Sequence, residues 1–199
     1  INYSTQRIKA VCVVHNETST GVTSDILAVI NAIDDAKHQA LLLVDTVYSL
    51  ASIDYQHDAW RVDVAIGGSQ KGLMLPAGLS FNAVSARALT LHTKSQYNRG
   101  YWEWGDMLLH NEKGFFPYTP ATNLIFGLQE SLKIILDEIG LDTVFGRHAR
   151  HASATRAAVA HWGLETVCRD HAAYSNTLTA VMTPPGASAN QLRKKILDK

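Results

Sequence analysis

A carboxylate and an amine each follow an apolar segment of this sequence. Asp45 directly follows the apolar residues 41–44, and Lys71 comes at the end of the apolar and glycine-rich stretch 62–70. A carboxylate that leaves an apolar strand is costly unless a cation or a hydrogen-bond donor meets it, so Asp45 is either a ligand-binding group or an ordinary cap or ion-pair partner. Desolvation favours the neutral form of a lysine, and a neutral amine is what a Schiff-base nucleophile requires.

One cofactor uses this pair of groups. Pyridoxal phosphate (PLP) binds a lysine through its aldehyde and needs an acidic partner at its pyridinium nitrogen. Asp45 would keep the ring protonated, and Lys71 would anchor the cofactor and later move a proton. Hydroxyls, amides and backbone N–H groups for the phosphate are available in residues 67–70 (GGSQ) and 118–123 (YTPATN).

Strands alternate with a helix in the part of the chain that must position these residues. Apolar runs predict strands over 8–14, 40–45, 62–70 and 79–85. The spacing of Ile26, Ile30 and Ile33 predicts a helix, with Ser24 as its N-cap. This order predicts an α/β fold with a mainly parallel sheet covered by helices on both faces, and ligands bind such sheets beyond the carboxyl ends of the strands.

The pattern becomes helical from residue 124 onward. Two amphipathic stretches, 124–140 and 141–163, meet at Gly140, where we expect a domain boundary. Residues 164–170 and 176–188 read as strands, which predicts the beginning of a small α+β domain.

We therefore assign residues 1–138 to part of a large cofactor-binding domain and residues 139–199 to a linking helix and the first part of a small C-terminal domain. The chain opens on Ile1 and its small domain stops short, so we expect it to be a piece of a longer protein.

The amino-acid composition limits the classes of partner that we expect for this protein. The 199 residues are 46% hydrophobic, and 18 Lys and Arg balance 18 Asp and Glu, so no basic face is available for nucleic acid or for an acidic membrane. No apolar stretch approaches the roughly 20 residues that span a bilayer. Cys12 and Cys168 are too few for a disulfide framework, which favours a cytoplasmic protein without a cysteine-rich metal site.

Five segments of the sequence resemble the class V aminotransferases, a family of fold-type I PLP-dependent enzymes, and most closely their serine-glyoxylate branch. The resemblance covers nearly the whole chain, and the segment around Lys71 is the most specific part. The segments are 15–22, 41–52, 62–85, 116–123 and 140–151.

The resemblance implies a role for several residues of the cofactor site. Lys71 would form the Schiff base, Asp45 would pair with the pyridine nitrogen, and Val47 would pack on one ring face. Thr18 matches a position near the phenolic oxygen, and Gln70 matches a glutamine that helps to hold the cofactor. Cysteine desulfurases of the same fold class carry a histidine at the latter position, so Gln70 favours amino-group transfer over sulfur removal.

The resemblance also implies a homodimer with a site shared between subunits. Thr119 matches a threonine that reaches the phosphate of the neighbouring subunit, whereas Phe116 replaces a tyrosine found in some alanine-using relatives and lacks its hydroxyl. The family's phosphate-binding loop and its ring-stacking aromatic would precede Ile1, and its substrate-binding arginine would follow Lys199. Arg193 lies too early in the small domain to be assigned that task.

The reaction implied is the transfer of an amino group from L-serine to glyoxylate, which yields 3-hydroxypyruvate and glycine. Close relatives use aspartate or alanine as the donor, so these remain alternatives. A catalytically silent module that keeps the fold is a further alternative, and the presence of both Lys71 and Asp45 speaks against it.

Other candidate residues favour structural roles. His148 and His151 are spaced for one metal ion but have no third ligand at a suitable spacing, so a solvated helix face is the better interpretation. His15 and Glu17 are spaced as an acid–base pair, although a hydrogen-bonded structural histidine fits equally well. The aromatic segment 100–106 suits an active-site mouth or a subunit contact, with core packing as the default.

Overall fold

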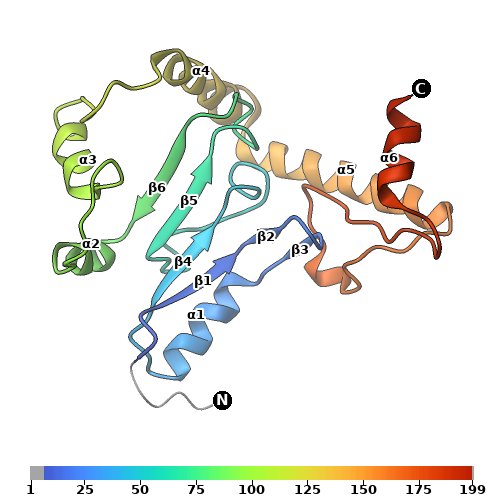
Figure 1. Cartoon of the computed structure of the whole chain (residues 1–199), viewed down its shortest axis with the longest axis horizontal. Coiled ribbons are helices and arrows are strands. Elements are labelled where there is room, and N and C mark those ends of the chain that lie inside the picture. The colour runs from blue at the N-terminus through green and yellow to red at the C-terminus, as the bar shows by residue number, and fades with distance from the viewer. Residues whose placement is uncertain (1–6, 199) are drawn as a thin grey trace.

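A four-stranded mixed sheet forms the centre of the computed structural model, which describes residues 7–198. The strand order is β1-β4-β5-β6; the first three strands run parallel, and β6 is antiparallel to β5 (Figure 1). A short antiparallel pair, β2 and β3, follows β1. The strands are β1 (Ala10–Val14), β2 (Asn16–Glu17), β3 (Val22–Thr23), β4 (Leu41–Asp45), β5 (Val64–Gly68) and β6 (Ser80–Val84). The mainly parallel α/β sheet predicted from the sequence is confirmed.

Helix α1 (Ile26–Asp35) packs on one face of this sheet. Its three predicted apolar positions are buried against alternate residues of β4, a contact made by Ile26, Ile30, Ile33, Leu42 and Val44. Burying side chains of this size stabilises the fold by about 1.5–3 kcal/mol each. Because side chains alternate along a strand, Asp45 lies on the sheet face opposite α1.

The N-cap of α1 differs from the prediction. The Ser24 hydroxyl donates to the Val14 carbonyl oxygen at 2.8 Å and is therefore bound to the end of β1. Asp25 takes the N-cap position instead, where its carboxylate accepts a hydrogen bond from the Ala28 N–H at 2.8 Å. Both are suitable N-cap residues, and the connection to the strand decides between them.

The face opposite α1 is less well covered. Val14, Asp45 and Ile66 are paired in register across β1, β4 and β5, so their side chains share this face. Val14 is 39% exposed and Ile66 is 41% exposed. The row that contains Asp45 is thus accessible from this side of the sheet.

Seven helical segments besides α1 follow in the described chain, and Figure 1 shows α5 leading away from the sheet toward α6. Gly140 has φ +83° and separates η1 from α5, which confirms the predicted break. A domain boundary there stays a prediction. The segments are α2 (Ala86–Thr93), α3 (Trp104–Asn111), α4 (Thr122–Leu132), the π-helix η1 (Lys133–Ile139), α5 (Leu141–His161), the 3-10 helix η2 (His171–Ala173) and α6 (Ala189–Leu197).

The strands expected over 164–170 and 176–188 do not form. Thr166 and Val181 make one isolated antiparallel bridge, flanked by two backbone hydrogen bonds. A second bridge joins Val22 of β3 to Tyr174, so this C-terminal segment packs back on the β2–β3 pair. One bridge does not make a ladder, and strands need a partner along their length to persist. Among residues 7–198, no helix has the length and apolar character that a membrane crossing requires.

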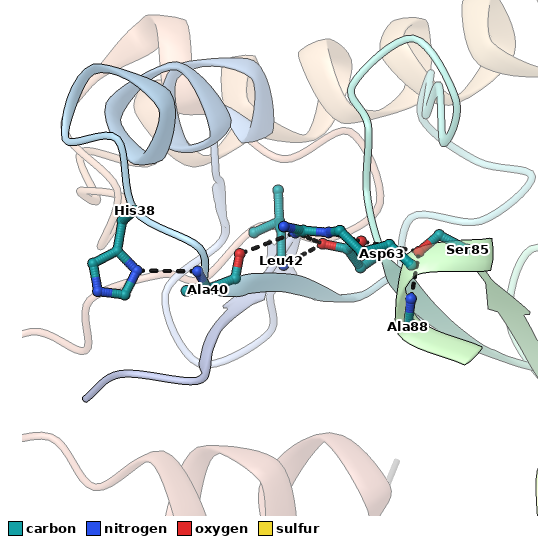
Figure 2. A network of polar contacts seen from close by, with 7 residues as sticks. His38, Ala40, Leu42, Asp63, Ser85 and Ala88 are labelled. Atoms are coloured by element: carbon teal, nitrogen blue, oxygen red, sulfur yellow. Dashed lines mark hydrogen bonds and ion pairs between the residues drawn. The ribbon is translucent and has the colours of Figure 1, made fainter. Parts of the chain in front are cut away.

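A buried carboxylate fixes the amino-terminal edge of the sheet. Asp63, which is 3% exposed, accepts hydrogen bonds from the Leu42 N–H, the Ser85 hydroxyl and the Arg87 Nε, each at 2.9 Å. Figure 2 shows how this network joins the start of β4 to Ser85, the N-cap of α2. Burial would raise the pKa of Asp63, but the hydrogen bonds from Arg87, Leu42 and Ser85 outweigh it and hold the pKa below its usual value.

Candidate active site

The carboxyl ends of β4 and β5 bring Asp45 and Lys71 to the same edge of the sheet. The two strands pair in parallel with Asp45 opposite Ile66, and Lys71 follows the end of β5 by three residues. The predicted carboxylate and amine therefore lie on adjacent loops. This is the edge at which α/β sheets bind ligands.

The Asp45 carboxylate is held by its own loop. Its Oδ1 accepts a hydrogen bond from the Val47 N–H at 2.8 Å. In the described part of the chain, Oδ2 forms no hydrogen bond with another residue. The carboxylate is thus oriented without being saturated.

The Lys71 amine is held by a tyrosine from the neighbouring loop. Lys71 Nζ donates to the Tyr48 hydroxyl at 2.6 Å and lies 3.9 Å from the centre of the Tyr48 ring. Both side chains are half-buried. Tyr48 was missed in the sequence, where the only signal was its position three residues after Asp45.

Ser69 closes the loop that carries Lys71. This fully buried residue donates from its hydroxyl to the Pro76 carbonyl at 2.7 Å, and its backbone exchanges hydrogen bonds with Leu79 and Leu75 at 3.1 Å. Leu73 and Leu75 of the same loop are buried against the helices that follow α3. The apolar residues after Lys71 thus anchor the loop that carries this lysine.

Gly72 lets the two loops approach closely. A Cβ atom added there would lie 2.1 Å from the Leu50 carbonyl oxygen and 2.4 Å from the Ser52 hydroxyl. A Cβ atom added at Gly67 would lie 2.7 Å from the end of the Leu50 side chain. A side chain at Gly72 would push apart the loops that bear Tyr48 and Lys71, so glycine is required there, whereas a Cβ atom at Gly67 would displace only the Leu50 side chain.

The other predicted cofactor residues lie on four different connections of the chain. Thr18 is exposed in the β2–β3 turn, Val47 is half-buried beside Asp45, and Gln70 is exposed. Thr119 is exposed in the connection between α3 and α4, and within residues 7–198 no hydrogen bond joins it to the loops after β4 and β5.

His15 is a buried residue and does not pair with Glu17. The His15 ring is 2% exposed and lies 5.6 Å from the rings of both Tyr55 and Trp60. Burial lowers the pKa of His15, opposed by the charge of Asp54. The Glu17 carboxylate instead accepts two hydrogen bonds from Ser19, which lower its pKa.

The remaining candidates gain no support as binding groups. Within residues 7–198, no three metal-ligating side chains cluster. His148 is half-buried and His151 is exposed. Burial lowers the pKa of His148, as do the nearby charges of Arg147 and His151. In the aromatic segment 100–106, Trp102 is 79% exposed beside the Tyr101 ring, and Trp104 is half-buried beside the His92 ring. Neither tryptophan belongs to the two buried clusters of the described chain.

The family profile described as aminotransferase class-V matches residues 2–198. The chain belongs to the class V aminotransferase family. The resemblance in the sequence and the edge geometry agree with this membership, and the fold is the one that the family implies.

Several class V aminotransferases are similar to this chain. It is 49% identical to a serine–glyoxylate aminotransferase of Hyphomicrobium methylovorum over 94% of this chain and 46% of that protein. It is 44% identical to an L-aspartate–glyoxylate aminotransferase of Paracoccus denitrificans over 96% of this chain and 48% of that protein. The crystal structure of ureidoglycine–glyoxylate aminotransferase from Bacillus subtilis superposes with a TM-score of 0.85, at 29% identity, over 96% of this chain and 49% of that one. The chain thus spans about half the length of these relatives.

Membership in the class V family implies PLP as the cofactor. The groups at the sheet edge have the chemistry that this cofactor requires: a carboxylate with an oxygen left for a ligand, and an amine on the adjacent loop. The residues present therefore fit the cofactor at this edge.

Proposed function

We propose that this chain is part of a PLP-dependent aminotransferase that transfers the amino group of L-serine to glyoxylate. The observation that carries the proposal is the placement of Asp45 and Lys71 on adjacent loops at the carboxyl ends of two parallel strands. The 49% identity to a serine–glyoxylate aminotransferase supports the choice of substrates.

Lys71 and Asp45 carry the chemistry in this proposal. When bound, PLP supplies an electron-withdrawing ring that stabilises negative charge on the substrate Cα. Lys71 binds the cofactor aldehyde and later moves the Cα proton on its Nζ atom. Asp45 holds a proton on the ring nitrogen through the oxygen that its own loop leaves unbound.

Three further residues hold the cofactor in place. Val47 would pack on one face of the ring, and its N–H is bonded to the Asp45 carboxylate. Thr18 would lie near the phenolic oxygen, and Gln70 would support the ring from the residue before Lys71. Their distribution around the edge, on the loops after β2, β4 and β5, supports a shared ligand.

A homodimer completes the site, with Thr119 reaching the phosphate bound by the partner subunit. The exposure of Thr119, together with a group of exposed aromatic side chains before it in the chain, supports a contact with another subunit. That group comprises Tyr97, Tyr101, Trp102, Phe115, Phe116 and Tyr118.

We also propose a domain division and a cellular location for the whole protein. Residues 1–138 form part of its large domain and residues 139–199 the start of its small domain, within a longer chain, and the break at Gly140 supports this division. Cys12 and Cys168 are free thiols, which supports a cytoplasmic location.

Aspartate is the second candidate for the amino donor. The 44% identity to an L-aspartate–glyoxylate aminotransferase favours it as the alternative. Discrimination between donors is a ratio of kcat/KM values, so kinetics with serine, aspartate and alanine decide the question.

Borohydride trapping tests the site directly. Full-length protein saturated with PLP is reduced with borohydride, digested and analysed by mass spectrometry, and we expect the cofactor on the Lys71 peptide. Lys71→Ala is expected to abolish both the trapped peptide and transamination, whereas Lys94→Ala, on an exposed residue at the end of α2, should leave both intact. Trapping on a different lysine, or activity that survives Lys71→Ala, would overturn the proposal.

A further inference from the structure

Tyr48 makes a close contact with the amine on which the proposed function depends. Its hydroxyl accepts a hydrogen bond from Lys71 Nζ at 2.6 Å, and the same nitrogen lies 3.9 Å from the ring centre. We infer that Tyr48 is a positioning residue, which holds the Lys71 amine near the reacting carbon whenever that amine is free. The inference rests on the proposed function of Lys71.

The backbone beneath Tyr48 is fixed on both sides of the residue. The Thr46 hydroxyl donates to the Ile66 carbonyl at 2.8 Å, which ties the start of this loop to β5. The Thr46 carbonyl accepts hydrogen bonds from Ser49 at 3.0 Å and from Leu50 at 2.8 Å, which closes a turn around Tyr48. The contact with Lys71 is therefore made from a rigid support.

The loop that bears Lys71 is fixed against the same support. Gly72, the next residue, lies so close to the Leu50 carbonyl that a Cβ atom would approach it to 2.1 Å. The Met74 N–H donates to the Lys71 carbonyl at 2.9 Å and closes a turn. Only the four-carbon side chain of Lys71 is then left to move, and Tyr48 contacts the end of it.

A free lysine amine has to be held if it is to act twice in one turnover. In the proposed reaction Lys71 would hold the cofactor and, once its amine is free, would move a proton at the substrate Cα. A flexible lysine that drifts into solvent loses the benefit of proximity. The Tyr48 hydroxyl can accept a hydrogen bond from the amine in either charge state, and the ring adds a cation–π contact once the amine carries a proton.

Amine labelling of the cofactor-free protein tests this contact without any turnover. Full-length protein and its Tyr48→Phe variant are treated with an acetylating succinimidyl ester, and the Lys71 peptide is quantified relative to the Lys94 peptide in the same sample. We expect Lys71 to react about fivefold faster in Tyr48→Phe, a factor equal to about 1 kcal/mol, because the hydrogen bond that restrains the amine against Tyr48 is lost. Tyr48→Leu, which also removes the ring, should react faster still.

Turnover and trapping complete the test. With PLP bound, Tyr48→Phe should lower kcat about fivefold with little change in KM for the amino donor, since the contact acts on the lysine and not on substrate binding. Tyr174→Phe, on a half-buried tyrosine of the C-terminal segment, is the matched control and should match the unmodified protein in both measurements. Tyr48→Phe preserves the ring and the packing, so this variant decides the outcome even if Tyr48→Leu fails to fold.

The outcomes separate this inference from the function on which it rests. Equal labelling of Lys71 in the unmodified protein and in Tyr48→Phe would overturn the inference, as would faster labelling with an unchanged kcat. Borohydride trapping of PLP on Lys71 would then still support the proposed function. Failure of that trapping in the unmodified protein would overturn the function itself.

Discussion

Two aspartates border the same sheet, and their surroundings differ. Asp63 lies at the amino-terminal edge, where its buried carboxylate accepts hydrogen bonds from the backbone of β4, from Ser85 and from Arg87. Asp45 lies at the carboxyl edge, where one oxygen accepts a single hydrogen bond from Val47 in its own loop. One carboxylate is saturated by the protein and the other is only oriented by it.

The difference indicates which aspartate holds the structure together and which is available to a ligand. A buried charge must be compensated, and Asp63 obtains that compensation entirely within the chain. Asp45 lies half-buried on the more open face, with Lys71 on the adjacent loop. A substitution that removes the charge should therefore affect stability at one edge and activity at the other.

Asp45→Asn is expected to give the largest effect, and that effect is on turnover. The amide keeps the oxygen that accepts the Val47 N–H but cannot act as an anion toward the pyridinium nitrogen. We expect kcat to fall roughly 100-fold or more, the cost typical of removing one preorganised electrostatic contact. Steady-state kinetics of the full-length protein with PLP, measured beside its thermal unfolding, check this.

Stability provides the control for that variant. The unfolding midpoint of Asp45→Asn should stay close to that of the unmodified protein, because the hydrogen bond of its loop survives. A large loss of stability with normal kcat in the folded fraction would contradict the assignment and make Asp45 a second structural carboxylate.

Asp63→Asn is expected to show the opposite behaviour. The amide places a donor among the four donor atoms of Leu42, Ser85 and Arg87, and it leaves Arg87 without its ionic partner. We expect the free energy of unfolding to fall by about 2–3 kcal/mol, below the usual cost for a fully buried pair because Arg87 is half exposed. Urea unfolding of the full-length protein measures this loss.

Kinetics provide the complementary control at Asp63. The folded fraction of Asp63→Asn should keep the kcat of the unmodified protein. The network that Figure 2 draws lies at the starts of β4 and β5, whereas Lys71 follows the end of β5. A loss of kcat without a loss of stability would show that the two edges do not divide these tasks.

The sequence predicts the elements that carry the two edges, but not every contact between their loops. Apolar runs and helical spacing predicted the sheet, α1 and the placement of Asp45 and Lys71, because these depend on local burial patterns. The contact between Tyr48 and Lys71 joins residues 23 positions apart, and it depends on how two loops pack at Gly72. No periodicity encodes such a contact.

The two predictions that the structure contradicts, a helix cap and a pair of strands, failed for similar physical reasons. Ser24 was predicted to cap α1, but a bond to the end of β1 occupies it, and a competing long-range partner is invisible in a local pattern. The strands expected over 164–170 and 176–188 have suitable composition but make only one bridge with each other. Strand formation depends on partners as much as on the residues themselves.

Substitution of His15 is expected to have the smallest effect of the three, and it tests the comparison between the two edges. It also lies at the carboxyl edge, where its N–H donates to the Asp45 carbonyl at 2.9 Å, and its buried Nδ1 has no hydrogen-bond partner among the described residues. An unsatisfied atom at this edge would suggest a ligand site, yet the ring is packed among Tyr55 and Trp60. We therefore expect His15 to act on stability and not on catalysis.

The pH dependence of unfolding tests this assignment. Burial lowers the pKa of His15 below its usual 6.5, so the unfolded chain binds a proton that the folded chain does not. The stability due to neutral His15 is complete above pH 6.5 and falls as the pH decreases toward the folded pKa, by at most about 1.4 kcal/mol per pH unit. His15→Leu should flatten this slope and leave kcat/KM at neutral pH within about twofold, since its backbone N–H is retained. His148 contributes a slope of the same sign, because burial also lowers its pKa, so His148→Leu is the matched variant. A kcat that collapses in His15→Leu while the slope of stability against pH is unchanged would instead make this ring part of the catalytic edge.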